Sequence, residues 1–227
     1  MLRRIFRWLF ILVITLLALS VLWVIAYRFI PVPGTPLMLI RNITEDIPVK
    51  HKWIPIKDIT PDMQLAVIAA EDSYFMQHNG FDWEQIEKAQ ADAKQGKKLR
   101  GASTISQQTA KNVFLWNGRS WVRKGLEAYF TVLIELLWSK ERIMEVYLNS
   151  IEMGEGLYGV AAVAETNFNK KPSKLTRKEC ALIAATLPNP RKFSSKKPSK
   201  YILKRRDAIL KNMIYIENTK LHRKSKE

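Results

Sequence analysis

The 227-residue sequence is poor in the residues that build covalent and metal cross-links. It contains one cysteine, Cys180, and three histidines, His51, His78 and His222. A single cysteine excludes an internal disulfide, and no cysteine or histidine pair has the spacing of zinc ligands. We therefore expect no His/Cys metal centre, and we expect Cys180 to be a buried core thiol rather than a nucleophile.

Acidic residues are also comparatively few. The chain has 37 lysines and arginines against 21 aspartates and glutamates, a formal net charge of +16. Such an excess indicates an anionic partner. Composition alone leaves three classes of partner open: nucleic acid, anionic lipid headgroups and a phosphorylated substrate.

One stretch lacks charge altogether. Trp8 to Tyr27 is a run of 20 uncharged residues, long enough as a helix to cross the hydrocarbon core of a bilayer. The alternatives are a cleaved signal peptide and a buried core helix, but the run is longer than the apolar region of a typical signal peptide and no clear small-x-small cleavage site follows. Three arginines precede the run. We therefore expect a cytoplasmic basic stub (1–7), a transmembrane helix (8–29) and all later residues outside the cytoplasm.

Proline and glycine mark where the remaining chain breaks. The cluster from Pro31 to Pro36 predicts a stiff linker, and residues 30–58 are expected to form a linker and membrane-proximal arm with a short strand or extended segment. Residues 59–217 read as one almost wholly helical domain, and 218–227 as a disordered charged tail. Helix starts are predicted at these potential capping residues: Thr60, Asp82, Ser120, Ser139 and Thr176.

The first chemically unusual stretch is Glu71-Asp72, which ends an apolar helix predicted to begin after Thr60. Burial disfavours the charged form of a carboxyl group, and the negative end of a helix adds to that effect. A carboxylate with a raised pKa is a better proton acceptor near neutral pH. The alternative is an exposed helix end followed by an ordinary loop histidine, His78. This stretch alone leaves the two interpretations evenly matched.

A second unusual stretch runs from Ser103 to Asn112. Read as a helix, Thr104, Gln108 and Lys111 share one face, a row of hydrogen-bond donors that ends in a cation. Such a face suits sugars and phosphate oxygens, although a solvated surface remains the alternative. In the next predicted helix Arg123 and Glu127 are four residues apart and share a face. They form either a structural ion pair or part of a site. The basic loop 94–101 is either a solvated loop or a flap that meets an anion.

Five segments in this order and spacing resemble the peptidoglycan glycosyltransferases of glycosyltransferase family 51, and more narrowly their monofunctional biosynthetic type in Gram-negative bacteria. The resemblance covers roughly Ile59 to Pro190 and the anchor. Asn167-Phe168 and Arg191-Lys192-Phe193 depart from the pattern, outside the proposed chemistry. The matching segments are Glu71-Asp72-x-x-Phe75-x-x-His78-x-Gly80, Arg100-Gly101-Ala102-Ser103-Thr104-Ile105-Ser106-Gln107-Gln108, Arg123-Lys124-x-x-Glu127, Ile143-x-Glu145-x-Tyr147-Leu148-Asn149, and Ala181 to Pro190.

The resemblance implies a mostly α, lysozyme-like fold with a small membrane-proximal jaw lobe. It implies lipid II, a lipid-linked disaccharide-peptide diphosphate, as the substrate that is polymerised into glycan strands. Membrane lipid is an expected partner, other cell-wall synthesis and division proteins are allowed as partners, and nucleic acid is not expected. The expected location is the inner membrane, with the catalytic domain in the periplasm.

The resemblance also implies roles for individual residues. Glu71 would be the general base and Glu127 the second acid. Asp72, Phe75 and His78 would hold the first motif together. No cofactor is obligatory, although a divalent cation (magnesium or manganese) at the diphosphate is allowed. The residues expected to bind sugar or phosphate are Ser103, Thr104, Gln108, Lys111, Asn112, Arg123, Lys124 and Tyr147.

Two rival functions remain open at this stage. A lysozyme-type lytic enzyme also places a glutamate at a helix end, but its leaving group is an uncharged sugar and needs no cation cluster. A membrane-anchored protein that binds anionic polymer would rely on charge alone. The sequence has no Ser-x-x-Lys with Lys-Thr-Gly signature, so we expect no transpeptidase activity.

Overall fold

The computed structural model describes residues 1–45, 47–96, 101, 103–118 and 120–224. The mostly helical class expected from the sequence is confirmed. In the described residues the α-helices are α1 (Leu2–Phe29), α2 (Pro36–Thr44), α3 (Pro61–Glu71), α4 (Trp83–Lys94), α5 (Ile105–Phe114), α6 (Trp121–Leu137), α7 (Lys140–Ser150), α8 (Gly159–Phe168), α9 (Arg177–Thr186) and α10 (Lys200–Lys224). Two short 3-10 helices, η1 (Ile56–Asp58) and η2 (Pro172–Lys174), and the strands β1 (Lys50–His51), β2 (Glu152–Gly154) and β3 (Leu157–Tyr158) complete the fold.

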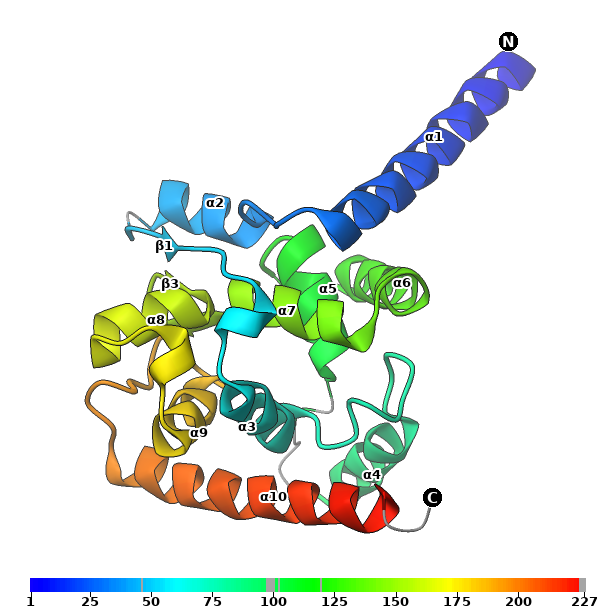
Figure 1. Cartoon of the computed structure of the whole chain (residues 1–227). Helices are drawn as coiled ribbons and strands as arrows, with labels where there is room; N and C mark the ends of the chain where they lie inside the picture. Colours follow the sequence, from blue (N-terminus) through cyan, green and yellow to red (C-terminus); the bar gives the residue numbers. More distant parts are fainter. Residues whose placement is uncertain (46, 97–100, 102, 119, 225–227) are drawn as a thin grey trace.

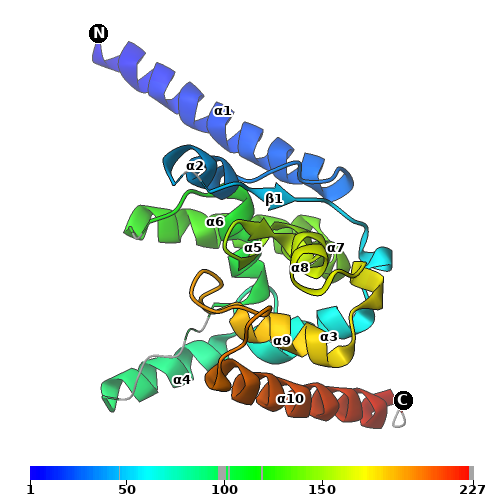
Figure 2. The same cartoon turned by 90° about the vertical axis from the view of Figure 1, so that its left-hand side faces the viewer.

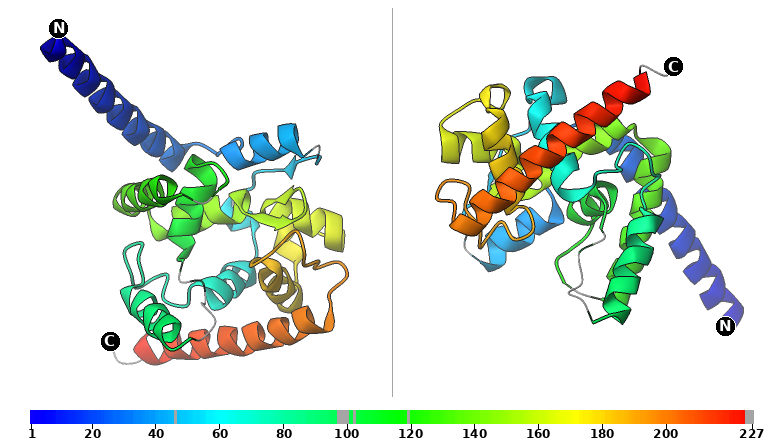
Figure 3. Two further views of the ribbon diagram at one scale, coloured as in Figure 1. Left: turned by 180° about the vertical axis from the view of Figure 1, so that it is seen from behind. Right: turned by 90° about the horizontal axis from the view of Figure 1, so that it is seen from below.

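The helices form successive layers along the molecule. Helix α1 projects from one end, α5 to α8 lie in the middle, and α10 crosses the opposite end beneath α3 and α9 (Figures 1 and 2). The view from below in Figure 3 shows α10 running across the whole underside of the domain. The start of α1 and helix α10 therefore lie at opposite ends of the molecule.

Helix α1 is the only described helix long and apolar enough to cross a membrane. It begins at Leu2, so most of the basic stub expected at 1–7 is already helical. Its last turns pack on the domain: Trp138 Nε1 donates to the carbonyl of Val24 at 2.8 Å. The Arg142 guanidinium donates to the carbonyl oxygens of Tyr27 and Ile30. Helix α1 is therefore held in a defined orientation relative to the domain.

The arm contains a helix that the sequence did not lead us to predict. We expected a short strand or an extended segment, and the strand is present as β1, but Pro36–Thr44 is helical. Thr35 caps this helix by accepting the Met38 N–H at 3.2 Å, and Pro36 occupies its first turn. These are ordinary helix-start residues, and the proline-rich context concealed them.

A small sheet ties the arm to the domain. Its order is β1-β3-β2, with β1 parallel to β3 and β2 antiparallel to it. Lys50 pairs with Leu157, and His51 pairs with Tyr158. The arm is thereby placed against the same part of the domain that carries Glu152 in β2.

The core lies where α3, α5, α7, α8 and α9 meet, and it includes Cys180, which is fully buried as expected. The predicted caps at Asp82, Ser120, Ser139 and Thr176 all accept a backbone N–H, whereas the Thr60 side chain makes no such bond.

The structure corrects the prediction of a disordered tail at residues 218–227. Helix α10 does not end near residue 217 but continues to Lys224, so residues 218–224 are helical rather than disordered. Residues 225–227 lie outside the described residues. Helix α10 packs against α9 and α3, and Asn212 donates to the carbonyl of Ala69 at 2.6 Å. This packing holds α10 beside the end of α3, where Glu71 lies.

Candidate functional site

Glu71 is the last residue of α3, and its side chain is 14% exposed. Its Oε2 accepts a hydrogen bond from Gln108 Nε2 at 3.0 Å, and Arg205 Nη2 lies 3.8 Å from Oε1. Desolvation by burial raises the pKa of Glu71, and the Gln108 hydrogen bond, Arg205 and Lys111 oppose that shift. Oε1 has no hydrogen-bond partner in the described residues. Glu71 therefore keeps one oxygen without a hydrogen bond, beside the guanidinium of Arg205, in a partly desolvated site, as a proton acceptor requires.

Gln108 is itself held in place from the other side. The hydroxyl of Tyr147, in α7, lies 3.2 Å from Gln108 Oε1 and donates to it. Tyr147 is completely buried, and desolvation raises the pKa of its hydroxyl well above the ordinary value. The hydroxyl keeps its proton, so the Gln108 amide is oriented with its nitrogen toward Glu71.

Lys111, Arg123 and Lys124 form a cation cluster around the buried carboxylate of Glu127. Arg123 Nη1 lies 3.1 Å from Glu127 Oε2, and Lys124 is paired with Oε1. Desolvation by burial lowers the pKa of Lys111, and the neighbouring positive charges of Arg123 and Lys124 lower it further. Three positive charges around one carboxylate leave an excess that an anion would neutralise.

Three adjoining cavities connect these groups. Gln108 and Pro188 line both the cation cavity, of about 530 Å³, and the base cavity, of about 710 Å³. A third cavity of about 260 Å³ shares Glu71 and Ser103 with the base cavity. The cation cavity is lined by Arg41, Gln108, Lys111, Asn112 and Arg123 together with apolar residues from α2, the α5–α6 loop and the segment after α9. Glu71 thus lines the base cavity and the smaller third cavity, and its partner Gln108 reaches the cation cavity, which the carboxylate of Glu152 also lines.

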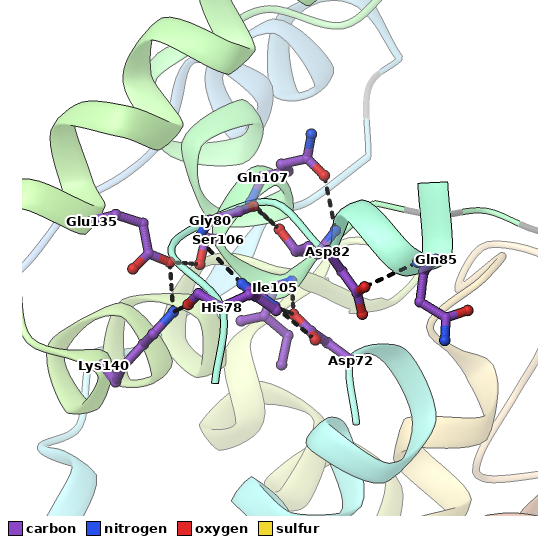
Figure 4. Close-up of polar contacts among 11 residues, drawn as sticks. Asp72, His78, Gly80, Asp82, Gln85, Ile105, Ser106, Gln107, Glu135 and Lys140 are labelled. Carbon is purple, nitrogen blue, oxygen red and sulfur yellow. Dashed lines mark hydrogen bonds and ion pairs between the residues drawn. The ribbon is translucent and has the colours of Figure 1, made fainter. Parts of the chain in front are cut away.

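Asp72 and His78 fix the start of α5 (Figure 4). The Asp72 carboxylate accepts the backbone N–H of Ile105 at 2.9 Å, and His78 Nε2 lies 2.9 and 3.0 Å from its two oxygens. The other ring nitrogen, Nδ1, accepts the N–H of Gly80, so the hydrogen is on Nε2 and points at Asp72. Phe75 is buried beside His78 and beneath the ammonium of Lys140. These contacts agree with the expectation that these residues hold the motif together.

A second polar network supports the same loop (Figure 4). Lys140 donates to the carbonyl of His78 at 2.6 Å and to Glu135 Oε1 at 2.8 Å. Ser106 donates to that same glutamate oxygen. Helices α5, α6 and α7 are therefore linked through Glu135 and the half-buried ammonium of Lys140, which also holds the loop at His78.

Three of the residues expected to bind substrate, Thr104, Asn112 and Tyr147, are already engaged in the fold, and the completely buried Tyr147 positions Gln108 instead of reaching a ligand. Thr104 caps α5, donates to the Gly80 carbonyl at 2.7 Å, and is 2% exposed. Asn112 donates back to the Gln108 carbonyl of its own helix, although it still lines the cation cavity. Because Thr104 precedes α5, the predicted row of Thr104, Gln108 and Lys111 does not form one helical face. Ser103, in contrast, lines both cavities next to Glu71.

The structure adds residues that the sequence reasoning missed. Arg205, in α10, faces Glu71, and Arg41, in α2, lines the cation cavity. The only sequence signal for Arg205 was the basic run Lys204-Arg205-Arg206, which looks the same as a solvated helix face. Arg100 and Ala102 of the second motif, and residues 97–100 of the predicted flap, lie outside the described residues.

The donor groups present do not fit a metal held by the protein alone. Nowhere in the described residues do three His, Cys, Asp or Glu side chains gather closely enough to hold an ion. Both oxygens of Glu127 are already paired with cations. Glu127 could offer at most one ligand to an ion brought by an anionic substrate.

Known proteins match this chain over most of its length. Residues 39–214 match the family model described as "Transglycosylase". The chain is 57% identical to a biosynthetic peptidoglycan transglycosylase of Bacteroides thetaiotaomicron over 93% of this chain and 87% of that protein. Proteins of the same description from Caulobacter vibrioides (53% identity, 91% and 90% covered) and Bdellovibrio bacteriovorus (51%, 90% and 84%) are similarly close.

Proposed function

The chain belongs to the transglycosylase family and is a peptidoglycan glycosyltransferase of cell wall synthesis, and on that premise we propose how its site works. Its substrates are lipid II and the growing glycan strand. We propose an inverting transfer in which a sugar 4-hydroxyl of the acceptor attacks the anomeric carbon of the donor. Polyprenyl diphosphate leaves. The observation that carries this mechanism is that Gln108, which is hydrogen-bonded to Glu71, lines both the cavity that contains Glu71 and the cavity that contains Lys111 and Arg123.

Glu71 acts as the general base. The attacking hydroxyl is a poor nucleophile until its proton is removed, and the free Oε1 of Glu71 accepts that proton. Burial raises the pKa of this carboxyl group, so proton transfer to it is more favourable than to a solvated glutamate. Gln108 holds the other oxygen at 3.0 Å, so Oε1 is the oxygen left to receive the proton.

The cation cluster stabilises the leaving group. Diphosphate gains negative charge as the glycosidic bond breaks, and preorganised cations lower the energy of that state. Lys111 and Arg123 line the cavity next to Glu71. Glu127 orients Arg123 and Lys124 through its two ion pairs and so acts as a positioning residue. Asn112 and Ser103 are placed to bind polar groups of the two sugars.

We propose that any divalent cation in the reaction arrives with the diphosphate. The cationic side chains supply the neutralising charge that a resident metal would otherwise provide. The protein would therefore keep activity in a chelator, with at most a modest reduction.

The apolar helix α1 and the apolar surface beside it support a site at the membrane. Helix α6 packs on α1, and its outer side carries large exposed apolar residues, of which Trp121 is 91% and Leu136 75% exposed. Aromatic and aliphatic side chains of this kind are stable at a bilayer interface. We propose that α1 spans the inner membrane with its N-terminus in the cytoplasm and that α6 rests on the periplasmic leaflet, where the polyprenyl chain of the substrate is held.

The rival functions explain the site less well. A lytic enzyme releases an uncharged sugar, so it has no use for the Lys111, Arg123 and Lys124 cluster. A polymer-binding protein has no use for a desolvated glutamate with a free oxygen. The described chain is accounted for by the anchor and one transferase domain, and we propose that it builds glycan without cross-linking peptides.

The test is polymerisation of labelled lipid II by the full-length protein in lipid vesicles. Glu71→Gln keeps the Gln108 contact but cannot accept a proton, so polymerisation should fall by about 100-fold to 10,000-fold. Glu165→Gln, an exposed residue of α8, is the matched control and should keep wild-type activity. Wild-type rates in Glu71→Gln would refute the base assignment. Release of soluble muropeptides from mature peptidoglycan would support the lytic function instead, and a parallel assay with a chelator tests the role of a metal.

A further inference from the structure

Arg41 is a cation of the membrane-proximal arm that reaches into the domain. It lies in α2, which packs against α5, and its side chain lines the cation cavity together with Lys111 and Arg123. Three positive side chains from three different helices therefore surround one cavity. None of the motifs that carry the family resemblance contains Arg41.

The guanidinium of Arg41 has an ion-pair partner, but at least one of its N–H donors has no acceptor in the described residues. One nitrogen, Nη1, is paired with Oε2 of Glu152, a buried residue of β2 whose Oε1 accepts the Gly156 N–H at 3.3 Å. The Arg41 side chain is 13% exposed, and its Nε is buried with no acceptor in the described residues. An arginine has five N–H donors, and leaving a buried one unpaired costs free energy. Glu152 thus orients Arg41, and the guanidinium retains N–H donors for a further acceptor.

The neighbours of Arg41 indicate the chemistry of that acceptor. Leu37 is four residues earlier in α2, shares a helix face with Arg41, and lines the same cavity. Leu115 and Trp116 from the end of α5 add further apolar surface there. The cavity therefore presents an apolar side followed by cations, which matches a hydrocarbon chain that ends in a diphosphate. Glu152, which lines the cavity, and Glu127, which lies beside Arg123, each already have an arginine partner, so the charge of Lys111 remains in excess.

We propose that Arg41 binds the diphosphate of the lipid-linked donor from the arm side, opposite Lys111 and Arg123, while Leu37 contacts the first isoprenoid units. This inference rests on the proposed function and adds a binding residue to the same site. Because α2 and Arg41 belong to the arm, the donor diphosphate is held between the arm and the domain. The alternative is that Arg41 only fastens the arm to Glu152.

Binding of farnesyl diphosphate to the full-length protein, measured by titration calorimetry in detergent, separates these two roles. Arg41→Gln should weaken binding by about tenfold or more, because a charge-assisted hydrogen bond to an anion is lost. Arg41→Lys keeps the charge without the fork of donors, so its affinity should fall between wild type and Arg41→Gln. Farnesol, which lacks phosphate, should bind all three proteins equally.

The matched control is Arg191→Gln. Arg191 also pairs with an arm carboxylate, Glu45, at 2.9 Å, but it does not line the cavity. Its loss should change farnesyl diphosphate affinity by less than about twofold. Equal losses in Arg191→Gln and Arg41→Gln would show that arm docking matters rather than direct contact, and would overturn the inference. Unchanged affinity in both Arg41 variants would overturn it as well.

Lipid II polymerisation separates failure of this inference from failure of the proposed function. Arg41→Gln should raise the KM for lipid II by about tenfold or more. A wild-type protein that polymerises lipid II while Arg41→Gln retains its KM would refute the role of Arg41 alone. A wild-type protein that does not polymerise lipid II would refute the proposed function, and the farnesyl diphosphate titration would still decide whether Arg41 binds the anion.

Discussion

The side-chain nitrogen of Gln108 lies 3.0 Å from Oε2 of Glu71 and donates a hydrogen bond to it. This contact joins the end of α3 to the middle of α5 across the site. Because Gln108 also lines the cavity that contains Lys111 and Arg123, one amide connects the base to the cations.

The first prediction concerns the stability cost of the base. Burial raises the pKa of Glu71, so protonation favours the folded state, and the charged form destabilises it once the pH exceeds that pKa. Glu71→Gln removes the charge and should raise the Tm at neutral pH. The gain should disappear below the ordinary pKa of a glutamate, where the wild-type side chain is protonated in both states. Thermal unfolding of both proteins across pH checks this, and a lower Tm for Glu71→Gln at neutral pH would contradict it.

The second prediction concerns the pH dependence of turnover. Glu71 accepts a proton only when ionised, so the rate should rise with pH through its raised pKa. The positive charge of Arg205 lowers that pKa, as do the Gln108 hydrogen bond and Lys111, while Asp72 raises it. Arg205→Gln should therefore move the acid limb of the pH–rate profile to higher pH.

Arg206→Gln is the control for this shift. Arg206 is the next residue of α10, and it pairs with Asp207 instead of Glu71. The acid limb of the pH–rate profile of Arg206→Gln should coincide with that of the wild type. An acid limb for Arg205→Gln that stays in place or moves to lower pH would show that Arg205 does not act on Glu71.

The third prediction concerns Asp72. Asp72→Ala leaves the Ile105 N–H and the His78 ring without their acceptor, and should cost about 1–3 kcal/mol of folding stability. Asp72→Asn retains one acceptor oxygen and should cost less. Urea unfolding measures the free energy of unfolding of both variants. The control is Asp58→Ala, at an exposed aspartate, whose stability should stay near that of the wild type. Equal stability of Asp72→Ala and wild type would mean that the start of α5 is held by other contacts.

The fourth prediction concerns the apolar face of α6. Leu136→Glu replaces an exposed apolar side chain by a charge, and should weaken seating on the bilayer by a factor of about ten or more. Polymerisation in vesicles should slow accordingly, whereas turnover of a short-chain lipid II analogue in detergent should be unchanged. The same substitution at exposed Ile214, in α10 far from α1, should affect neither assay. Equal rates for Leu136→Glu in vesicles and in detergent would argue against membrane contact by α6.

Several features of the fold were predictable because they depend on near neighbours in the chain. The caps of α4, α6, α7 and α9 follow from single side chains that bond N–H groups two or three residues later. The ion pair of Arg123 with Glu127 follows from their separation of one helical turn. Helix α2 also has local signals, Thr35 and Pro36, but the prolines around it favoured an extended segment.

The contribution of distant residues was not predictable in the same way. Thr104 and Gln108 look equally suited to bind a substrate, yet packing buries Thr104 as a helix cap and leaves Gln108 between two cavities. Arg205 lies more than a hundred residues after Glu71, and only the docking of α10 on α3 brings them together. The sequence alone could not distinguish it from the neighbouring basic residues of the same helix.

The sequence by itself determined the helical class, the membrane anchor and the placement of two acids at the end of an apolar helix, because hydrophobic runs, periodicity and capping act over a few residues. Tertiary structure alone decided that Glu71 faces Gln108 and Arg205, and that Arg41 reaches the cations of α5 and α6. Burial, and with it the raised pKa of the base, depends on which surfaces pack together. That packing is a property of the whole chain.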